Sequence, residues 1–233
     1  MKHIFNRGDN RLNTDKIIKM LEYCGMSYKN TQPDVFDKMI FINDKITDVQ
    51  CFLRISGDEM TITFRGSDSR KDRIVDSKFW RSVIPYDNYS SKIRVHSGFI
   101  STYKSKSIRG RIQKEIEKNK IKKVALTGHS YGAALAVLCA VDLEYNFPKN
   151  DYEVIVFGCP RVGNKYFQKS YNLRVFKTLR VENVNDLVTK VPFACMGYRH
   201  VGASLKIGGK GMFSVPNMHA HTLQEYYPSI LKL

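Results

Sequence analysis

The chain has 233 residues, of which 42% are hydrophobic, and its formal net charge is +16. That length and apolar content suffice for one globular domain with a substantial core, over residues 1–233. The five cysteines are odd in number and scattered without C-x-x-C spacing, which argues against a disulfide framework and predicts reduced core thiols.

No leader or membrane-spanning segment is visible in the sequence. The N-terminus turns polar at once and builds no apolar run of signal-peptide type. The most apolar stretch, residues 124–143, contains a histidine, a serine and an aspartate, and so fits a strand followed by a buried helix better than a membrane span. We therefore expect a cytoplasmic protein.

The positive charge is spread widely along the chain. Short basic clusters occur at residues 70–73 and 118–123, without the motifs that accompany nucleic-acid recognition. This spread favours a solvated lysine-rich surface over attraction to an anionic lipid interface, and either of these over specific nucleic-acid binding.

The first half of the chain predicts a helix, a hairpin and a second helix. Apolar residues recur at helical spacing over residues 14–28, behind Thr14 and Asp15. Apolar residues alternate over residues 48–55 and again over 60–64, which predicts a β-hairpin. Between residues 98 and 120, isoleucines spaced by four with charges between them predict one amphipathic helix.

The second half predicts alternating strands and helices. Residues 124–127 form a strand-like run, and residues 133–145 are apolar nearly all round, as in a buried helix. Further strands are predicted at 152–157 and 178–184, whereas glycine-rich residues 202–217 predict a loop or hairpin. This rhythm is typical of an α/β fold with a mostly parallel sheet and helices on both faces.

Residues 128–132 read Gly-His-Ser-Tyr-Gly and lie between the predicted strand and helix. In this context G-x-S-x-G predicts a nucleophile elbow, in which Ser130 sits in a strained turn with its hydroxyl exposed. The alternative is a glycine-rich turn with an N-capping serine. The N–H of Tyr131 would point toward an oxyanion that forms beside Ser130.

A serine hydroxyl needs a histidine base, and that base needs a carboxylate to orient it. Asp186 follows a predicted strand and is our candidate acid, with an Asx-turn aspartate as the alternative. Of the three downstream histidines, His221 heads a helix-like run and is preferred over His200, which we expect in a strand. Both are preferred over His219.

The sequence bears on two further roles, metal binding and the second oxyanion donor. His219 and His221 have the spacing of metal ligands on a strand, but no third ligand lies beside them, so we expect no metal site. Gly66 and Ser67 end an early strand, so the Ser67 N–H is the candidate second oxyanion donor, with an ordinary strand-ending turn as the alternative.

Several blocks in the same order resemble the class 3 lipases, the fungal-lipase-like branch of the α/β-hydrolases. They are residues 64–67 (Phe-Arg-Gly-Ser), 95–99 (Val-His-Ser-Gly-Phe), 127–133 around the elbow, 157–164 (Phe-Gly-Cys-Pro-Arg-Val-Gly-Asn) and 185–188 (Asn-Asp-Leu-Val). Tyr131 stands where that family usually has leucine, Ala133 where it has a second glycine, and Thr189 where proline is common.

The resemblance implies an α/β-hydrolase fold, hydrolysis of carboxylic esters such as acylglycerols or phospholipids, and no cofactor. It also implies a lid over residues 68–94. Four apolar residues there would form the face of the lid toward substrate: Ile74, Val75, Phe79 and Trp80.

We therefore predict a serine ester hydrolase with Ser130 as nucleophile, His221 as base, Asp186 as acid, and Ser67 and Tyr131 as oxyanion donors. Its partner would be a lipid or acyl-ester substrate, without specific nucleic acid. Peripheral contact with an anionic membrane or lipid surface is the second-ranked interpretation of the positive charge, after a solvated surface. Two alternatives remain: an esterase or thioesterase acting on small soluble substrates, and a non-catalytic module that binds anionic lipid.

Overall fold

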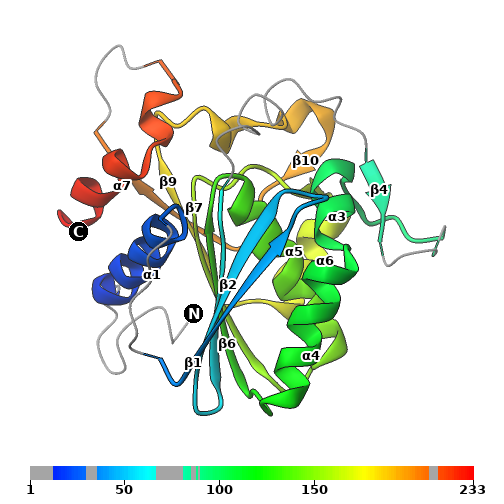
Figure 1. The fold of residues 1–233 in the computed structure, drawn as a ribbon. Coiled ribbons are helices and arrows are strands. Elements are labelled where there is room, and N and C mark those ends of the chain that lie inside the picture. Colours follow the sequence, from blue (N-terminus) through cyan, green and yellow to red (C-terminus); the bar gives the residue numbers. More distant parts are fainter. Residues whose placement is uncertain (1–12, 30–35, 67–80, 85–87, 89, 210–214) are drawn as a thin grey trace.

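A computed structural model describes residues 13–29, 36–66, 81–84, 88, 90–209 and 215–233 of the protein. Its centre is a seven-stranded sheet with the order β1-β2-β3-β6-β7-β9-β11 (Figure 1). The strands are β1 Lys38–Asp44, β2 Val49–Ser56, β3 Glu59–Phe64, β6 Lys123–His129, β7 Asp151–Phe157, β9 Thr178–Asn183 and β11 Ala203–Ile207. All neighbours from β3 to β11 are parallel, which confirms the predicted sheet type.

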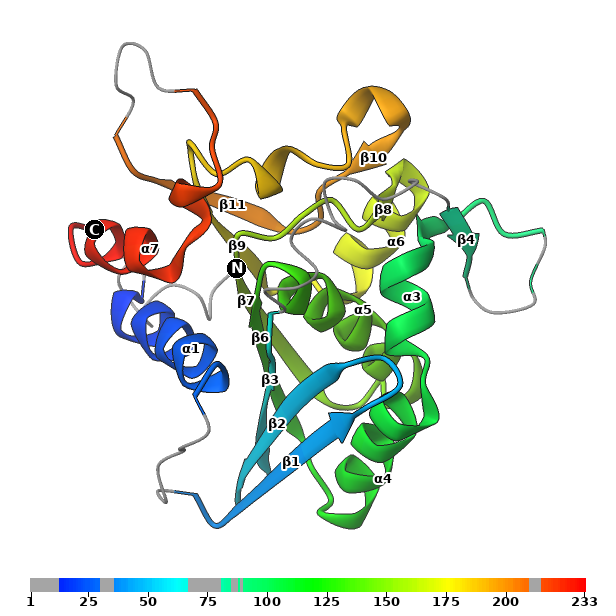
Figure 2. The same cartoon turned by 45° about the horizontal axis from the view of Figure 1, so that its top comes forward.

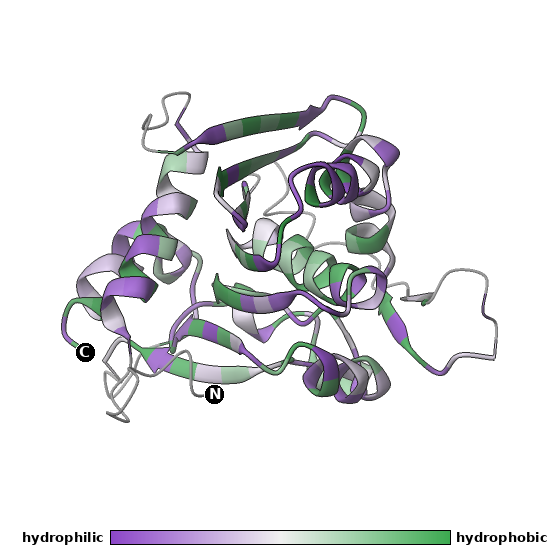
Figure 3. Cartoon of the chain, turned by 90° about the horizontal axis from the view of Figure 1, so that it is seen from below, coloured by the Kyte–Doolittle hydropathy of each residue, from purple (hydrophilic) through white to green (hydrophobic). Residues whose placement is uncertain are grey.

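Helices cover both faces of this sheet, as the sequence predicted. Helices α1 Thr14–Ser27 and α7 Leu223–Ile230 lie on one face, and α3 Ser97–Tyr103, α4 Arg111–Lys118, α5 Tyr131–Asn146 and α6 Lys165–Arg174 on the other (Figures 1 and 2). Helix α5 is buried along most of its length, and Figure 3 shows it as a largely hydrophobic helix at the centre of the molecule. The apolar residues of this helix therefore anchor the larger of the two cores.

The predicted helix over residues 98–120 is wrong in its continuity. The chain forms α3, leaves the helical conformation at Ser105, and continues through a π-helical turn, Lys106–Gly110, into α4. The Ser105 hydroxyl donates to the buried carboxylate of Asp44 at the end of β1, so a contact from a distant strand accompanies the break. The three spaced isoleucines are nevertheless buried, as expected from their pattern.

The prediction of a loop or hairpin at residues 202–217 is also corrected. Residues 203–207 form β11, a parallel edge strand whose partner is β9. Its side chains are mostly exposed, so the strand lacks the apolar alternation that would have indicated it. Farther along, Asn217 forms an isolated bridge with Asp186.

A second, four-stranded sheet lies beside the main one, and the sequence did not predict it. Its strands are β10 Tyr198–Arg199, β8 Gly163–Asn164, β5 Arg94–His96 and β4 Arg81–Val83, in that order. Strands this short carry too few residues to show a period of two. In the described part of the chain, no helix has the length and apolar character needed to cross a bilayer.

Candidate active site

The Gly-x-Ser-x-Gly segment forms a sharp turn between β6 and α5. Ser130 adopts φ 59° and ψ −124°, a conformation that is costly for a residue with a side chain. The Ser130 N–H donates to the carbonyl of Phe157 on the neighbouring strand at 3.0 Å. A Cβ atom on Gly132 would lie 2.3 Å from the Phe64 carbonyl oxygen, so glycine is required for this close approach. The local geometry is that of a nucleophile elbow.

Asp186 and His221 form a buried hydrogen-bonded pair. The Nδ1 atom of His221 lies 2.7 Å from Oδ2 of Asp186, and the side chains are 1% and 0% exposed. Asp186 lies in the loop after β9, and its Oδ1 accepts from the Val188 N–H at 2.8 Å. The Tyr226 hydroxyl of α7 donates to Oδ2 at 2.6 Å. Three donors thus orient the carboxylate and offset the cost of burying it.

Burial and the Asp186 carboxylate raise the pKa of Tyr226 well above its ordinary value. The phenol therefore stays protonated and keeps donating to Asp186.

His221 lies next to the elbow on two sides. Its ring stacks on that of His129, which immediately precedes Ser130, with 4.4 Å between ring centroids. Gly158 follows Phe157, whose carbonyl accepts the Ser130 N–H. A Cβ atom on Gly158 would lie 2.7 Å from Cε1 of His221. Within the described part of the chain, Oγ of Ser130 and Nε2 of His221 are both buried and have no hydrogen-bond partner.

The other two histidines lie elsewhere. Nε2 of His200 is 2.9 Å from the Thr189 carbonyl oxygen, and His200 immediately follows β10 instead of lying within a strand. His219 is 81% exposed and lies 3.7 Å from Glu225. Of the three candidates, only His221 contacts Asp186.

The predicted oxyanion donors are only partly described. Tyr131 is the first residue of α5, so its N–H belongs to the group that points out of a helix N-terminus. Its hydroxyl donates to the Gly98 carbonyl at 3.1 Å and accepts from Thr102 at 2.8 Å, which ties the elbow to α3. Ser67 lies outside the described residues.

The lid segment proposed over residues 68–94 is described only in part. Its four candidate apolar residues (Ile74, Val75, Phe79 and Trp80) lie outside the described residues. The described part includes β4 and Arg94 of β5, which pair antiparallel with each other in the smaller sheet.

Sequence reasoning missed two side chains of this site. Tyr226 donates a hydrogen bond to Asp186. The only signal for it in the sequence was its place in the helix-like run that follows His221. Tyr28 lies at the end of α1, and its hydroxyl is 3.0 Å from Nδ1 of His129. Nothing in the sequence links these two positions. An open cavity of about 920 Å³ adjoins the site between α1 and α7 and is lined in part by Tyr28, His129 and Thr222.

The model of the family described as lipase (class 3) matches residues 61–196, which is 136 of the 233 residues. The chain belongs to the class 3 lipase family. Phospholipase A1-Ialpha2 of Arabidopsis thaliana is 32% identical over 74% of this chain and 44% of its own length. A lipase of Rhizomucor miehei is 33% identical over 60% of the chain and 39% of its own length. The chain thus spans less than half of either relative.

Solved structures of fungal lipases share the fold. The native propeptide complex of the Rhizomucor miehei lipase superposes with a TM-score of 0.69 at 26% identity, over 82% of this chain and 67% of that one. A triacylglycerol lipase from Penicillium expansum gives a TM-score of 0.73 at 19% identity, over 89% of this chain and 91% of the other. The chain has the α/β-hydrolase fold.

Proposed function

We propose that the protein hydrolyses carboxylic esters of lipids through an acyl intermediate on Ser130. The observation that carries this proposal is the buried Asp186–His221 pair beside a strained serine turn. Similarity to phospholipases A1, a galactolipase and lipases also supports it.

In the proposed reaction, His221 Nε2 accepts the Ser130 proton while Oγ bonds to the ester carbonyl carbon. The oxyanion is stabilised by the Tyr131 N–H and, as a further proposal, by the Ser67 N–H. The C–O bond to the alcohol breaks, and His221 returns the proton to the leaving alcohol. His221 then takes a proton from water as the water oxygen bonds to the acyl carbon. The bond from that carbon to Ser130 Oγ breaks, His221 passes the proton to Oγ, and the fatty acid leaves. Asp186 orients His221 and stabilises its imidazolium form.

We propose a lipid surface, preferably an anionic one, as the setting of this reaction. The net charge of +16 favours anionic headgroups. A run of four exposed residues, Phe193 to Met196, follows the Asp186 loop, and its two large side chains are 50% and 38% exposed. We call this run the apolar loop. The lid over residues 68–94 remains a separate proposal, based on the family resemblance.

The test is hydrolysis of p-nitrophenyl butyrate and palmitate by wild type and Ser130→Ala, with and without phosphatidylglycerol vesicles. We expect Ser130→Ala to lower kcat by at least about a thousandfold, because no other group forms the acyl bond. A preference for palmitate together with vesicle activation would support the lipid substrate. A short-chain optimum without response to vesicles would point to the soluble-ester alternative. Vesicle binding without turnover by folded wild type would favour the non-catalytic module.

A further inference from the structure

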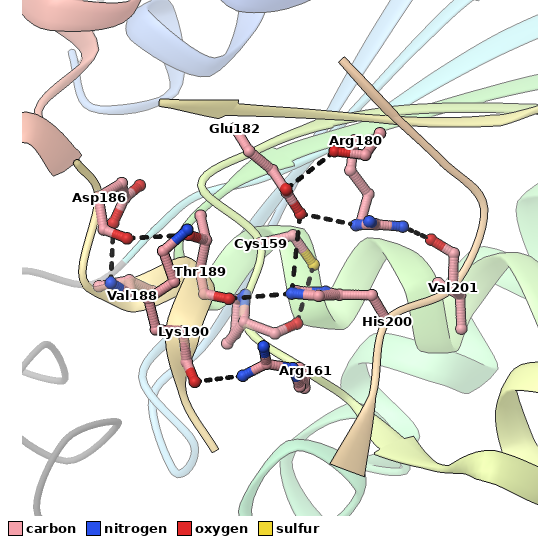
Figure 4. Close-up of polar contacts among 12 residues, drawn as sticks. Cys159, Arg161, Arg180, Glu182, Asp186, Val188, Thr189, Lys190, His200 and Val201 are labelled. Carbon is pink, nitrogen blue, oxygen red and sulfur yellow. Dashed lines mark hydrogen bonds and ion pairs between the residues drawn. The ribbon is translucent and has the colours of Figure 1, made fainter. Parts of the chain in front are cut away.

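A buried polar cluster lies beneath the loop that carries Asp186. Arg180 and Glu182 project from β9 and form an ion pair with 3.0 Å between Nε and Oε1 (Figure 4). Both side chains are less than 10% exposed. Arg180 also donates to the Val201 and Gly202 carbonyls, and the Ser204 hydroxyl donates to Glu182 at 2.9 Å. The ion pair is therefore satisfied on both sides and fixes the chain around residue 201.

His200 lies between this ion pair and the Asp186 loop. Its Nε2 is 2.9 Å from the Thr189 carbonyl oxygen and 3.7 Å from Oε1 of Glu182 (Figure 4). A carbonyl oxygen only accepts, so Nε2 carries the hydrogen and donates it to Thr189. Burial, together with the Arg180 guanidinium, lowers the pKa of His200 below its ordinary value, which keeps the ring neutral near pH 7.

Thr189 connects His200 to Asp186. The Thr189 hydroxyl donates to the Asp186 backbone carbonyl at 2.8 Å, and the Thr189 carbonyl receives the hydrogen bond from His200. Two successive hydrogen bonds thus join the imidazole to the backbone of the residue that holds His221. Arg161 supports the next part of the loop by donating to the Lys190 and Pro192 carbonyls.

We infer that His200 is a positioning residue, which holds the Asp186 loop through Thr189 so that the Asp186 carboxylate meets Nδ1 of His221. This inference rests on the proposed ester hydrolysis. Asp186 acts most strongly when His221 carries the extra proton in the transition state, so a displaced loop lowers kcat more than it raises KM.

The test compares His200→Leu with His200→Gln on p-nitrophenyl butyrate. Leucine removes the donor to Thr189, whereas the glutamine amide supplies an N–H at a similar reach. We expect His200→Leu to lower kcat about ten- to a hundredfold with KM within about twofold, because small misplacements of catalytic groups have effects of this size. His200→Gln should restore most of kcat.

The matched control is Tyr171→Phe, which removes the buried hydrogen bond to Thr178 at the opposite end of β9. It should lower the melting temperature without changing kcat.

Should His200→Leu fail to fold, Thr189→Val tests the same connection, and it should also lower kcat with KM within about twofold of wild type. Equal impairment of His200→Leu and His200→Gln would overturn the inference. So would a kcat of His200→Leu within about twofold of wild type. Inactive wild type would instead overturn the proposed function, and this inference with it.

Discussion

At the scale of single residues, Gly158 sets the position of His221. Its φ is +56°, a region that residues with side chains rarely adopt. A Cβ atom there would lie 2.7 Å from Cε1 of His221 and 2.9 Å from Oδ2 of Asp186. Both contacts are with buried groups that have little room to move, so glycine is required here for its lack of a side chain.

We expect Gly158→Ala to lower kcat on p-nitrophenyl butyrate by about a hundredfold, because the methyl group displaces His221 from Ser130. Gly25→Ala is the control, since a Cβ atom at Gly25 in α1 meets nothing within 4 Å. That control should keep wild-type kcat and gain roughly 0.5–1 kcal/mol of stability from the better helix propensity of alanine. Wild-type kcat in a folded Gly158→Ala variant would show that a methyl group at residue 158 does not displace His221.

At the scale of elements, His96 connects the smaller sheet to α3. Its Nδ1 accepts the Gly98 N–H at 3.1 Å, which caps the first turn of α3, and its ring packs 4.4 Å from that of Phe99. Burial lowers the pKa of His96 from 6.5 to about 4. The neutral ring is therefore the form that the fold requires, and protonation of Nδ1 would remove the acceptor.

The stability contribution of His96 should depend on pH in a defined direction. The unfolded state binds a proton near pH 6.5 and the folded state only near pH 4, so the contribution is present above 6.5 and is lost as pH falls toward 4. The loss reaches roughly 3 kcal/mol at most. Urea unfolding at pH 7.5 and pH 4.5 measures it against His96→Asn, which keeps a capping acceptor but does not titrate. A pH dependence unchanged in His96→Asn would refute the prediction.

Prediction of elements succeeded where the signal was long and local. The helix α5 and the strand β7 have many successive apolar residues, so their existence followed from continuous apolar runs within one segment. The strand β9 was also predicted, although Arg180 and Glu182 interrupt its apolar residues. The expected helix over residues 98–120 is interrupted, and β1 was not predicted. The interruption at Ser105 coincides with a contact to β1, which periodicity within one segment does not contain.

At the scale of the whole molecule, the apolar loop and the positive charge together predict how the protein binds to anionic vesicles. We expect the double variant Phe193→Ser, Met196→Ser to bind phosphatidylglycerol vesicles at least about tenfold more weakly, since each buried apolar side chain contributes roughly 1.5–3 kcal/mol. Binding of wild type should also weaken with added salt. Hydrolysis of p-nitrophenyl butyrate without vesicles should not change.

The control for that experiment is Leu173→Ser, Phe176→Ser. These residues are 84% and 60% exposed and precede β9, at the opposite end of that strand from Asp186. This variant should bind vesicles as wild type does. Equal losses in both double variants would show general apolar adsorption instead of docking through the apolar loop.

The sequence by itself determined the elbow, the parallel sheet and the family. Each depends on contiguous residues or on the order of short segments along the chain, which the sequence shows directly. It also nominated Asp186 and His221, but among alternatives. Only the tertiary structure decided which histidine meets Asp186, that Tyr226 supports it, and that His200 lies beneath its loop. These contacts join residues brought together by the pairing of β9 with β11 and the packing of α7. Contacts between residues so far apart in the sequence produce no local pattern of apolar residues from which they could be predicted.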